Sequence, residues 1–215
     1  MDRSGRQVLL DTNKGRFHEG AHCCLIFSGE EERRRSVAPY LAYGLAQGER
    51  VHYFGDVSSE DEVQSWLRGL DLDLPLPPPS KPGEMEFVEA VRCYCPGGVF
   101  NPDTMLNKLI HCYQDAVDAG YPGARVTGEM TWALRGLPGS ERLVEYEARI
   151  NQIVDEHPVT AVCQYDARRF DGATILDVLR VHPMMIVHGQ VVRNPYYTKP
   201  EEFLARHEPT RTARG

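Results

Sequence analysis

The stretch over residues 22–54 constrains the fold of this chain more than any other part of its sequence. Residues 23–27 form an apolar run of strand length, which Ser28-Gly29 interrupts. The next segment carries apolar residues at a 3.6-residue spacing, and Gly48 follows it as a helix C-terminus favours. A second apolar run over 51–54 completes the order strand, glycine turn, helix and strand. This order predicts a βαβ unit with a parallel pair of strands.

The turn after the first strand is where nucleotide-binding proteins of this architecture carry their phosphate loop. Here it reads Ser28-Gly29-Glu30-Glu31-Glu32, with no second glycine and no Gly-Lys-Ser/Thr sequence. The three glutamates repel a polyphosphate, and no lysine is present to hold its β and γ phosphates. The turn therefore has the position of a phosphate loop without its chemistry, and we expect no ATP hydrolysis.

The rest of the chain continues the alternation of strands and helices. Strands are expected over 87–95, 124–127, 160–165 and 184–187, with a closing hairpin at 191–192. Helices are expected over 102–119, 140–156 and 174–181. The 215 residues suffice for one domain that buries a full sheet. The pattern predicts an α/β fold with a doubly wound, mostly parallel sheet.

Charge, apolar segment length and cysteine content limit the classes of function that we expect for this chain. The formal net charge is −7, which argues against direct binding of nucleic acid. No apolar segment of the sequence reaches membrane-spanning length, and the N-terminus carries no signal-peptide apolar region. Six cysteines without a secretory context predict reduced thiols. We therefore expect a cytoplasmic protein that binds neither nucleic acid nor membrane.

Residues that follow the strands are the candidates for a ligand site, because ligands of doubly wound sheets bind outside the carboxyl ends of the strands. Aromatic walls with a few polar groups suit a small organic molecule. Trp132 and Tyr165 are the expected walls. The alternative is that Trp132 and Tyr165 pack under loops and that Glu129 is solvated. The candidate residues near the strand ends are Glu129, Trp132, Gln164, Tyr165, Asp166 and His182.

Two other classes of function stay open. In an enzyme acting on a small organic substrate, Glu129 or Asp166 would serve as general base. In a metal, haem or thiol sensor, the candidates are His22, Cys93 and Cys95, the two cysteines sharing one face if they lie on a strand. His22 begins its strand, which places it away from the predicted pocket. Since no ligand motif has the spacing of a known metal site, no cofactor is predicted.

Several short motifs in a fixed order resemble a known family. They are His22-x-Cys24-x-Ile26-Phe27, Glu31-Glu32, Gly44-Leu45 with Gly48-Glu49, RVTGEMTW at 125–132, Tyr146-Glu147, CQYD at 163–166, His182-Pro183 and Asn194-Pro195-Tyr196-Tyr197. Together they resemble the MEDS domain, the methanogen/methylotroph DcmR sensory domain. The resemblance covers residues 18–197, between an N-terminal extension over 1–17 and a polar tail over 198–215.

The resemblance implies a RecA-like, P-loop-NTPase-like fold with a degenerate phosphate loop. It also implies a cytoplasmic sensory module for small organic molecules, including hydrocarbon derivatives. Tyr146 and Glu147 would close the ligand pocket or support it. Residues 1–20 are too short for a helix-turn-helix module. We therefore expect a freestanding sensory domain that signals through a separate protein partner in transcription regulation.

Overall fold

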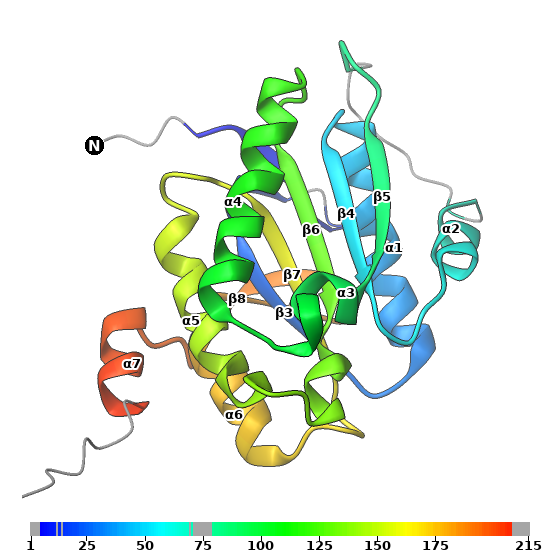
Figure 1. Ribbon diagram of the computed structural model, residues 1–215. Coiled ribbons are helices and arrows are strands. Elements are labelled where there is room, and N and C mark those ends of the chain that lie inside the picture. The colour runs from blue at the N-terminus through cyan, green and yellow to red at the C-terminus, as the bar shows by residue number, and fades with distance from the viewer. Residues whose placement is uncertain (1–4, 12, 14, 69, 71–78, 208–215) are drawn as a thin grey trace, which may run out of the picture.

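The predicted βαβ unit forms as β3 (His22–Phe27), α1 (Glu30–Ala46) and β4 (Arg50–Gly55) in the computed structural model (Figure 1). The structure describes residues 5–11, 13, 15–68, 70 and 79–207. β3 and β4 run in the same direction, as predicted, but they are not a pair. β6 (Ala124–Glu129) and β7 (Thr160–Asp166) lie between them.

The described strands form a seven-stranded sheet in the order β5-β4-β6-β7-β3-β8-β9. β5 (Glu84–Glu89) and β8 (Met184–Val187) extend its parallel part, and β9 (Gln190–Arg193) pairs antiparallel with β8. A separate antiparallel pair consists of β1 (Gln7–Leu9) and β2 (Arg16–His18). The prediction of an α/β fold with a mostly parallel sheet is confirmed.

Helices cover both faces of this sheet (Figure 1). The helices besides α1 are α2 (Glu60–Arg68), α3 (Ala90–Tyr94), α4 (Pro102–Asp118), α5 (Leu143–Ile153), α6 (Gly172–Val181) and α7 (Pro200–His207). Short 3-10 turns are η1 (Pro96–Gly98), η2 (Met130–Arg135) and η3 (Ser140–Arg142). Among the described helices none is both long and apolar enough to span a membrane.

Local capping sets where two of the helices begin. The Asn101 side chain accepts the backbone N–H of Thr104 at 3.1 Å, and Pro102 occupies the first turn, so α4 begins where predicted. Asp171 caps α6, which therefore begins at Gly172, two residues before the predicted start.

The strand predicted over 87–95 is wrong in its second half. β5 starts earlier and ends at Glu89, and α3 follows at once. The buried residues of this segment are Ala90, Cys93 and Tyr94, whose i, i+3, i+4 spacing is that of one helix face. As a helix, the segment places all three in the core beside an edge strand. Cys93 and Cys95 therefore do not share a strand face, contrary to the prediction.

Side chains of the sheet alternate between two cores. The α1 core, which lies under α1 and α2, contains the strand residues Cys23, Leu25, Val51, Tyr53 and Val162. The α5 core, which lies under α3 to α6, contains Cys24, Phe54, Val126, Cys163 and Tyr165. Successive residues of a strand point to opposite faces. Neighbours in sequence therefore enter different cores.

A buried ion pair joins β6 to α1 and β1. Arg125 Nε lies 2.6 Å from Glu49 Oε2, and both side chains are fully buried. The guanidinium also donates to the backbone carbonyls of Tyr40 at 2.5 Å and Leu9 at 3.0 Å. A Cβ at Gly44 would lie 2.9 Å from Arg125 Cδ, so glycine leaves room for this side chain. The contact fixes three segments at one point.

Arg125→Met should lower the free energy of unfolding by about 3–5 kcal/mol, because it removes the buried partner of the Glu49 carboxylate. Urea unfolding followed by circular dichroism measures the change. The control is Arg34→Met, which breaks an exposed pair with Glu31 and should leave the midpoint unchanged. Equal midpoint shifts in the two variants would contradict the role assigned to Arg125.

Candidate functional site

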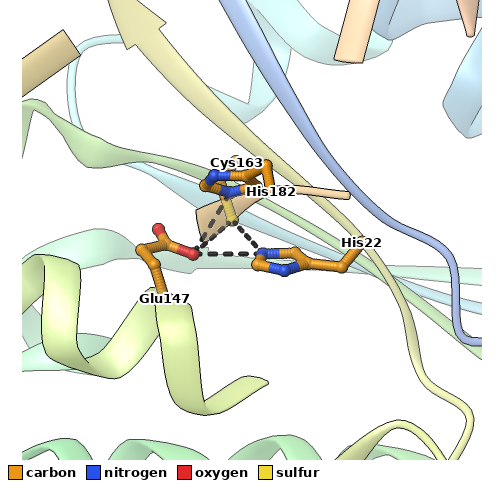
Figure 2. A group of neighbouring side chains, drawn as sticks. All are labelled: His22, Glu147, Cys163 and His182. Atoms are coloured by element: carbon orange, nitrogen blue, oxygen red, sulfur yellow. Dashed lines mark hydrogen bonds and ion pairs between the residues drawn. The ribbon is translucent and has the colours of Figure 1, made fainter. Parts of the chain in front are cut away.

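Four polar side chains meet inside the α5 core (Figure 2). They come from four parts of the fold: His22 opens β3, Cys163 lies in the middle of β7, Glu147 belongs to α5, and His182 follows α6. None is more than 4% exposed. Buried polar groups are costly unless they bind a partner. We call this group the His-Glu-Cys-His cluster.

Strand pairing and helix periodicity bring these residues together. His22 pairs with Ala161, which places His22 on the same face of the sheet as Cys163 two residues further along β7. Glu147 lies one turn from Leu143 on the buried face of α5. His182 leaves α6 in an extended conformation before Pro183 and so turns back toward the sheet.

One ring nitrogen of each histidine and the sulfur of the cysteine lie close to a single oxygen, Glu147 Oε2. This oxygen lies 3.1 Å from His22 Nε2, 3.2 Å from Cys163 Sγ and 3.4 Å from His182 Nε2. Cys163 Sγ lies 3.6 Å from His22 Nε2. The four atoms all lie within 4.8 Å of one another.

Contacts outside the cluster fix how each ring is oriented. His182 Nδ1 donates to the Val178 carbonyl at 2.7 Å, so its proton is on Nδ1. His22 Nδ1 lies 3.1 Å from Asn151 Oδ1, while the Asn151 amide nitrogen donates to backbone carbonyls. Both imidazoles therefore turn Nε2 toward the centre. The Tyr165 hydroxyl donates to Glu147 Oε1 at 2.6 Å and leaves Oε2 for the cluster.

Burial controls the protonation of the cluster. It lowers the pKa of His22, and the neighbouring His182 lowers it further. Burial alone would raise the pKa of Glu147, but His182 and His22 outweigh it and hold this pKa well below its usual value. Burial and then Glu147 raise the pKa of the Cys163 thiol. A protonated, inaccessible thiol is a poor nucleophile, which does not favour a Cys-His catalytic site.

The predicted ligand residues divide between the two cores. Glu129, Gln164 and Asp166 occupy strand positions whose side chains point toward the α1 core. Trp132 and Tyr165 lie in the α5 core. The expectation that they converge on one rim is therefore wrong, because side chains alternate along the strands. Tyr146 is also buried in the α5 core. The assignment of these residues to ligand binding stays a prediction.

Glu129 binds elements of its own fold. It accepts from the Tyr53 hydroxyl at 2.6 Å and from Arg33 at 3.1 Å. It also accepts the backbone N–H groups of Asp56, Val57 and Ser58, the loop that follows β4. Burial would raise its pKa, but these donors outweigh burial and lower it. A carboxylate held in this way is a weak general base.

Asp166 and Gln164 also have partners inside the fold. The Asp166 carboxylate contacts the Arg168 guanidinium at 2.7 and 2.8 Å, and this hydrogen bonding lowers the pKa of Asp166. Gln164 donates to the Thr127 hydroxyl at 2.9 Å. The two candidate general bases are therefore both stabilised as anions, which does not favour the enzyme alternative.

Of the predicted ligand residues, the structure brings Glu147, Tyr165 and His182 into contact. It adds His22, which the sequence placed away from the site, and Cys163, which was not among the predicted ligand residues. The feature of the sequence that could have indicated them is that His22 and Cys163 are polar residues within apolar strands. Their proximity depends on β3 and β7 being neighbours, which the sequence alone did not indicate. Cys93 and Cys95 are not members of the cluster.

A cavity of about 110 Å³ opens at the carboxyl ends of β3 and β8. It adjoins a depression of about 570 Å³ with which it shares Glu32 and His188. Glu32, near the turn that follows β3, lines both. The walls of the cavity are Cys24, Ile26, Glu32, Met185, Ile186, Val187 and His188.

Among proteins of known structure, the chain is similar to a KaiC-like protein from Pyrococcus horikoshii OT3. The likeness has a TM-score of 0.50 at 16% identity and covers 86% of this chain and 81% of that one. The ATPase EscN of the enteropathogenic E. coli type III secretion system has a TM-score of 0.48 at 11% identity, over 95% of this chain and 50% of that one. The likeness to the KaiC-like protein is one of fold.

The sequence matches the profile of the MEDS domain, the "MEthanogen/methylotroph, DcmR Sensory domain", over residues 21–183. The chain therefore belongs to the MEDS family. It is also similar to the transcriptional repressor DcmR of Methylorubrum extorquens, with 27% identity over 167 residues. That similarity covers 77% of this chain and 58% of the repressor. A sensory role in regulation follows from the family.

Glu129→Gln should destabilise the fold by about 1.5–3 kcal/mol at neutral pH, since the loop amides and Arg33 lose a charged acceptor. The pKa of Glu129 in the folded state lies below the usual 4.5. Its contribution is therefore complete above the unfolded pKa and is lost as pH falls through the folded pKa. Urea unfolding of both proteins at several pH values should show their difference shrinking in acid. A difference that grows in acid would contradict this assignment.

Proposed function

We propose that this chain is a cytoplasmic sensory domain that binds a small organic molecule and signals to a partner regulator without hydrolysing ATP. The observation that carries the proposal is the largely apolar cavity at the carboxyl ends of β3 and β8, where this fold class places its ligands. The cavity adds polar groups from Glu32 and His188 at its mouth, which can orient a ligand.

The size of the cavity limits the ligand. An apolar cavity of about 150 Å³ accommodates benzene. The volume of about 110 Å³ therefore suits a smaller molecule, unless the ligand extends into the adjoining depression. Ile26 and Met185 supply apolar contact, while Glu32 offers an acceptor. A short-chain organic compound with one donor group matches this lining.

The turn after β3 supports the absence of ATP chemistry. Glu32 Oε2 accepts the backbone N–H of Ser28 at 2.9 Å, which occupies an amide that a phosphate would need. Glu30 pairs with Arg33 at 2.7 Å and with Arg168 at 3.0 Å. The acidic turn thus satisfies its own charges, and its basic neighbours are engaged with carboxylates.

A partner could read the state of this domain through α7. Phe203 of α7 packs with Ala148 of α5 and Val181 of α6 in a small cluster separate from both main cores. Because α7 packs on both α5 and α6, a shift of α5 against α6 would change its docking. The chain spans 58% of the length of the DcmR repressor.

A ligand of the cavity should stabilise the folded chain. At about a hundred times its Kd, a bound compound adds about 2.7 kcal/mol and raises Tm by roughly 5–10 °C. Thermal unfolding with short-chain alcohols, amines and ketones identifies such a compound. Ile26→Phe, which fills the cavity, should abolish the shift. Leu176→Phe, an exposed change on α6, should retain it. A shift retained in Ile26→Phe would overturn the assigned site.

ATP with magnesium should leave the Tm unchanged and yield no phosphate above the protein-free rate, because the turn offers no lysine and its Ser28 amide is already bonded to Glu32. Thermal unfolding and a phosphate-release assay measure the two effects. Saturable stabilisation by ATP would contradict the proposal for this turn.

A further inference from the structure

The His-Glu-Cys-His cluster contains more acceptors than protons. In the neutral rings the outer contacts place the proton on Nδ1, which leaves a lone pair on Nε2 of His22 and of His182. Both lone pairs face the Glu147 carboxylate at 3.1 and 3.4 Å. The Cys163 thiol supplies one hydrogen, which it donates to the same oxygen. His182 Nε2 finds no hydrogen-bond partner among the described residues, although it is buried.

A cation at the centre would satisfy all four groups. Zinc–nitrogen and zinc–oxygen distances of about 2.0–2.1 Å and zinc–sulfur distances of about 2.3 Å place tetrahedral ligands about 3.3–3.6 Å apart. The pairs centred on Glu147 Oε2 are 3.1 to 3.4 Å apart, and Cys163 Sγ lies 3.6 Å from His22 Nε2. The four atoms come from different elements and surround a common point (Figure 2).

We propose that His22, Glu147, Cys163 and His182 bind a divalent transition-metal ion of the zinc type. Binding displaces the thiol proton of Cys163 to solvent, and the metal–sulfur bond replaces the S–H bond. The resulting thiolate and the Glu147 carboxylate together balance the charge of the ion. Two nitrogens, one oxygen and one sulfur form a donor set suited to zinc rather than to magnesium or calcium.

The outer contacts of the ligands match those of metal sites. Histidines that bind metals donate their other ring N–H to a carbonyl or carboxylate, which fixes the tautomer. The Val178 carbonyl does this for His182, and the Asn151 side chain does it for His22. Tyr165 donates to the second oxygen of Glu147. Four protein ligands in a fully buried site favour a structural or regulatory metal over a catalytic one.

The test uses the 215-residue chain freed of metal by chelation under reducing conditions. Titration with cobalt(II) should saturate at one equivalent and give the visible absorption of a tetrahedral cobalt site. A thiolate-to-cobalt charge-transfer band should appear with it. Zinc should displace the cobalt and raise the unfolding midpoint of the apo chain. Metal analysis of the protein as purified gives the resident ion.

Cys163→Ser should lose the charge-transfer band and most of the metal-induced rise in midpoint. Cys24→Ser is the matched control: Cys24 is a buried thiol on the same sheet face, outside the cluster, and this variant should keep both. Near-UV circular dichroism identifies variants that fold. His182→Gln is the second ligand variant and should weaken cobalt binding while retaining the thiolate band.

Two results would overturn the proposal. One is a folded wild-type chain that takes up no stoichiometric cobalt or zinc. The other is a cobalt spectrum that Cys163→Ser and Cys24→Ser change equally. The organic-ligand proposal is tested separately, by the thermal shift of apo and metal-loaded chains with Ile26→Phe as its control. A lost thermal shift with intact cobalt spectra, or the reverse, shows which of the two proposals fails.

Discussion

The alternation of side chains across a sheet that is covered on both faces is the constraint on which the rest of this structure depends. Every central strand sends successive residues into two separate cores. On β7, Gln164 therefore faces the α1 core and Tyr165 the α5 core. Two polar systems result: the Glu129 network beside α1, and the His-Glu-Cys-His cluster under α5. Neither can share residues with the other, because the sheet lies between them.

The two systems satisfy buried charge in different ways. Glu129 receives five donors from the backbone and side chains around it, so its charge is balanced without any added group. Glu147 faces two imidazole nitrogens and a thiol, and with both rings neutral the thiol alone brings a hydrogen to Oε2. A complete hydrogen-bond network fixes a loop. The network around Glu147 is incomplete and joins side chains from four parts of the fold, and a bound cation would complete it.

Local chemistry made the helices and strands predictable, whereas the site depended on strand order. Asn101 and Pro102 marked the start of α4, and the apolar run over 160–165 marked β7. The strand prediction for the segment after Glu89 was wrong, because its five residues have helical spacing but also show a loose apolar–polar alternation. His22 and Cys163 are 141 residues apart and meet only because β3 pairs with β7. The residue pattern within either segment does not indicate which strand is its neighbour. The sequence prediction therefore placed His22 away from the site.

The position of the cluster connects the proposed ligand cavity to α7. His22, Cys24 and Ile26 occupy one face of β3 at steps of about 6.6 Å, so the cluster, the cavity floor and the cavity wall follow one another along the strand. Burial and then the Glu147 carboxylate raise the pKa of Cys24, which lines the cavity, to about 12. On the opposite side, Ala148 and Val181 are chain neighbours of Glu147 and His182 and support Phe203 of α7. The cluster therefore lies between the proposed ligand cavity and α7, the two ends of the proposed signalling path.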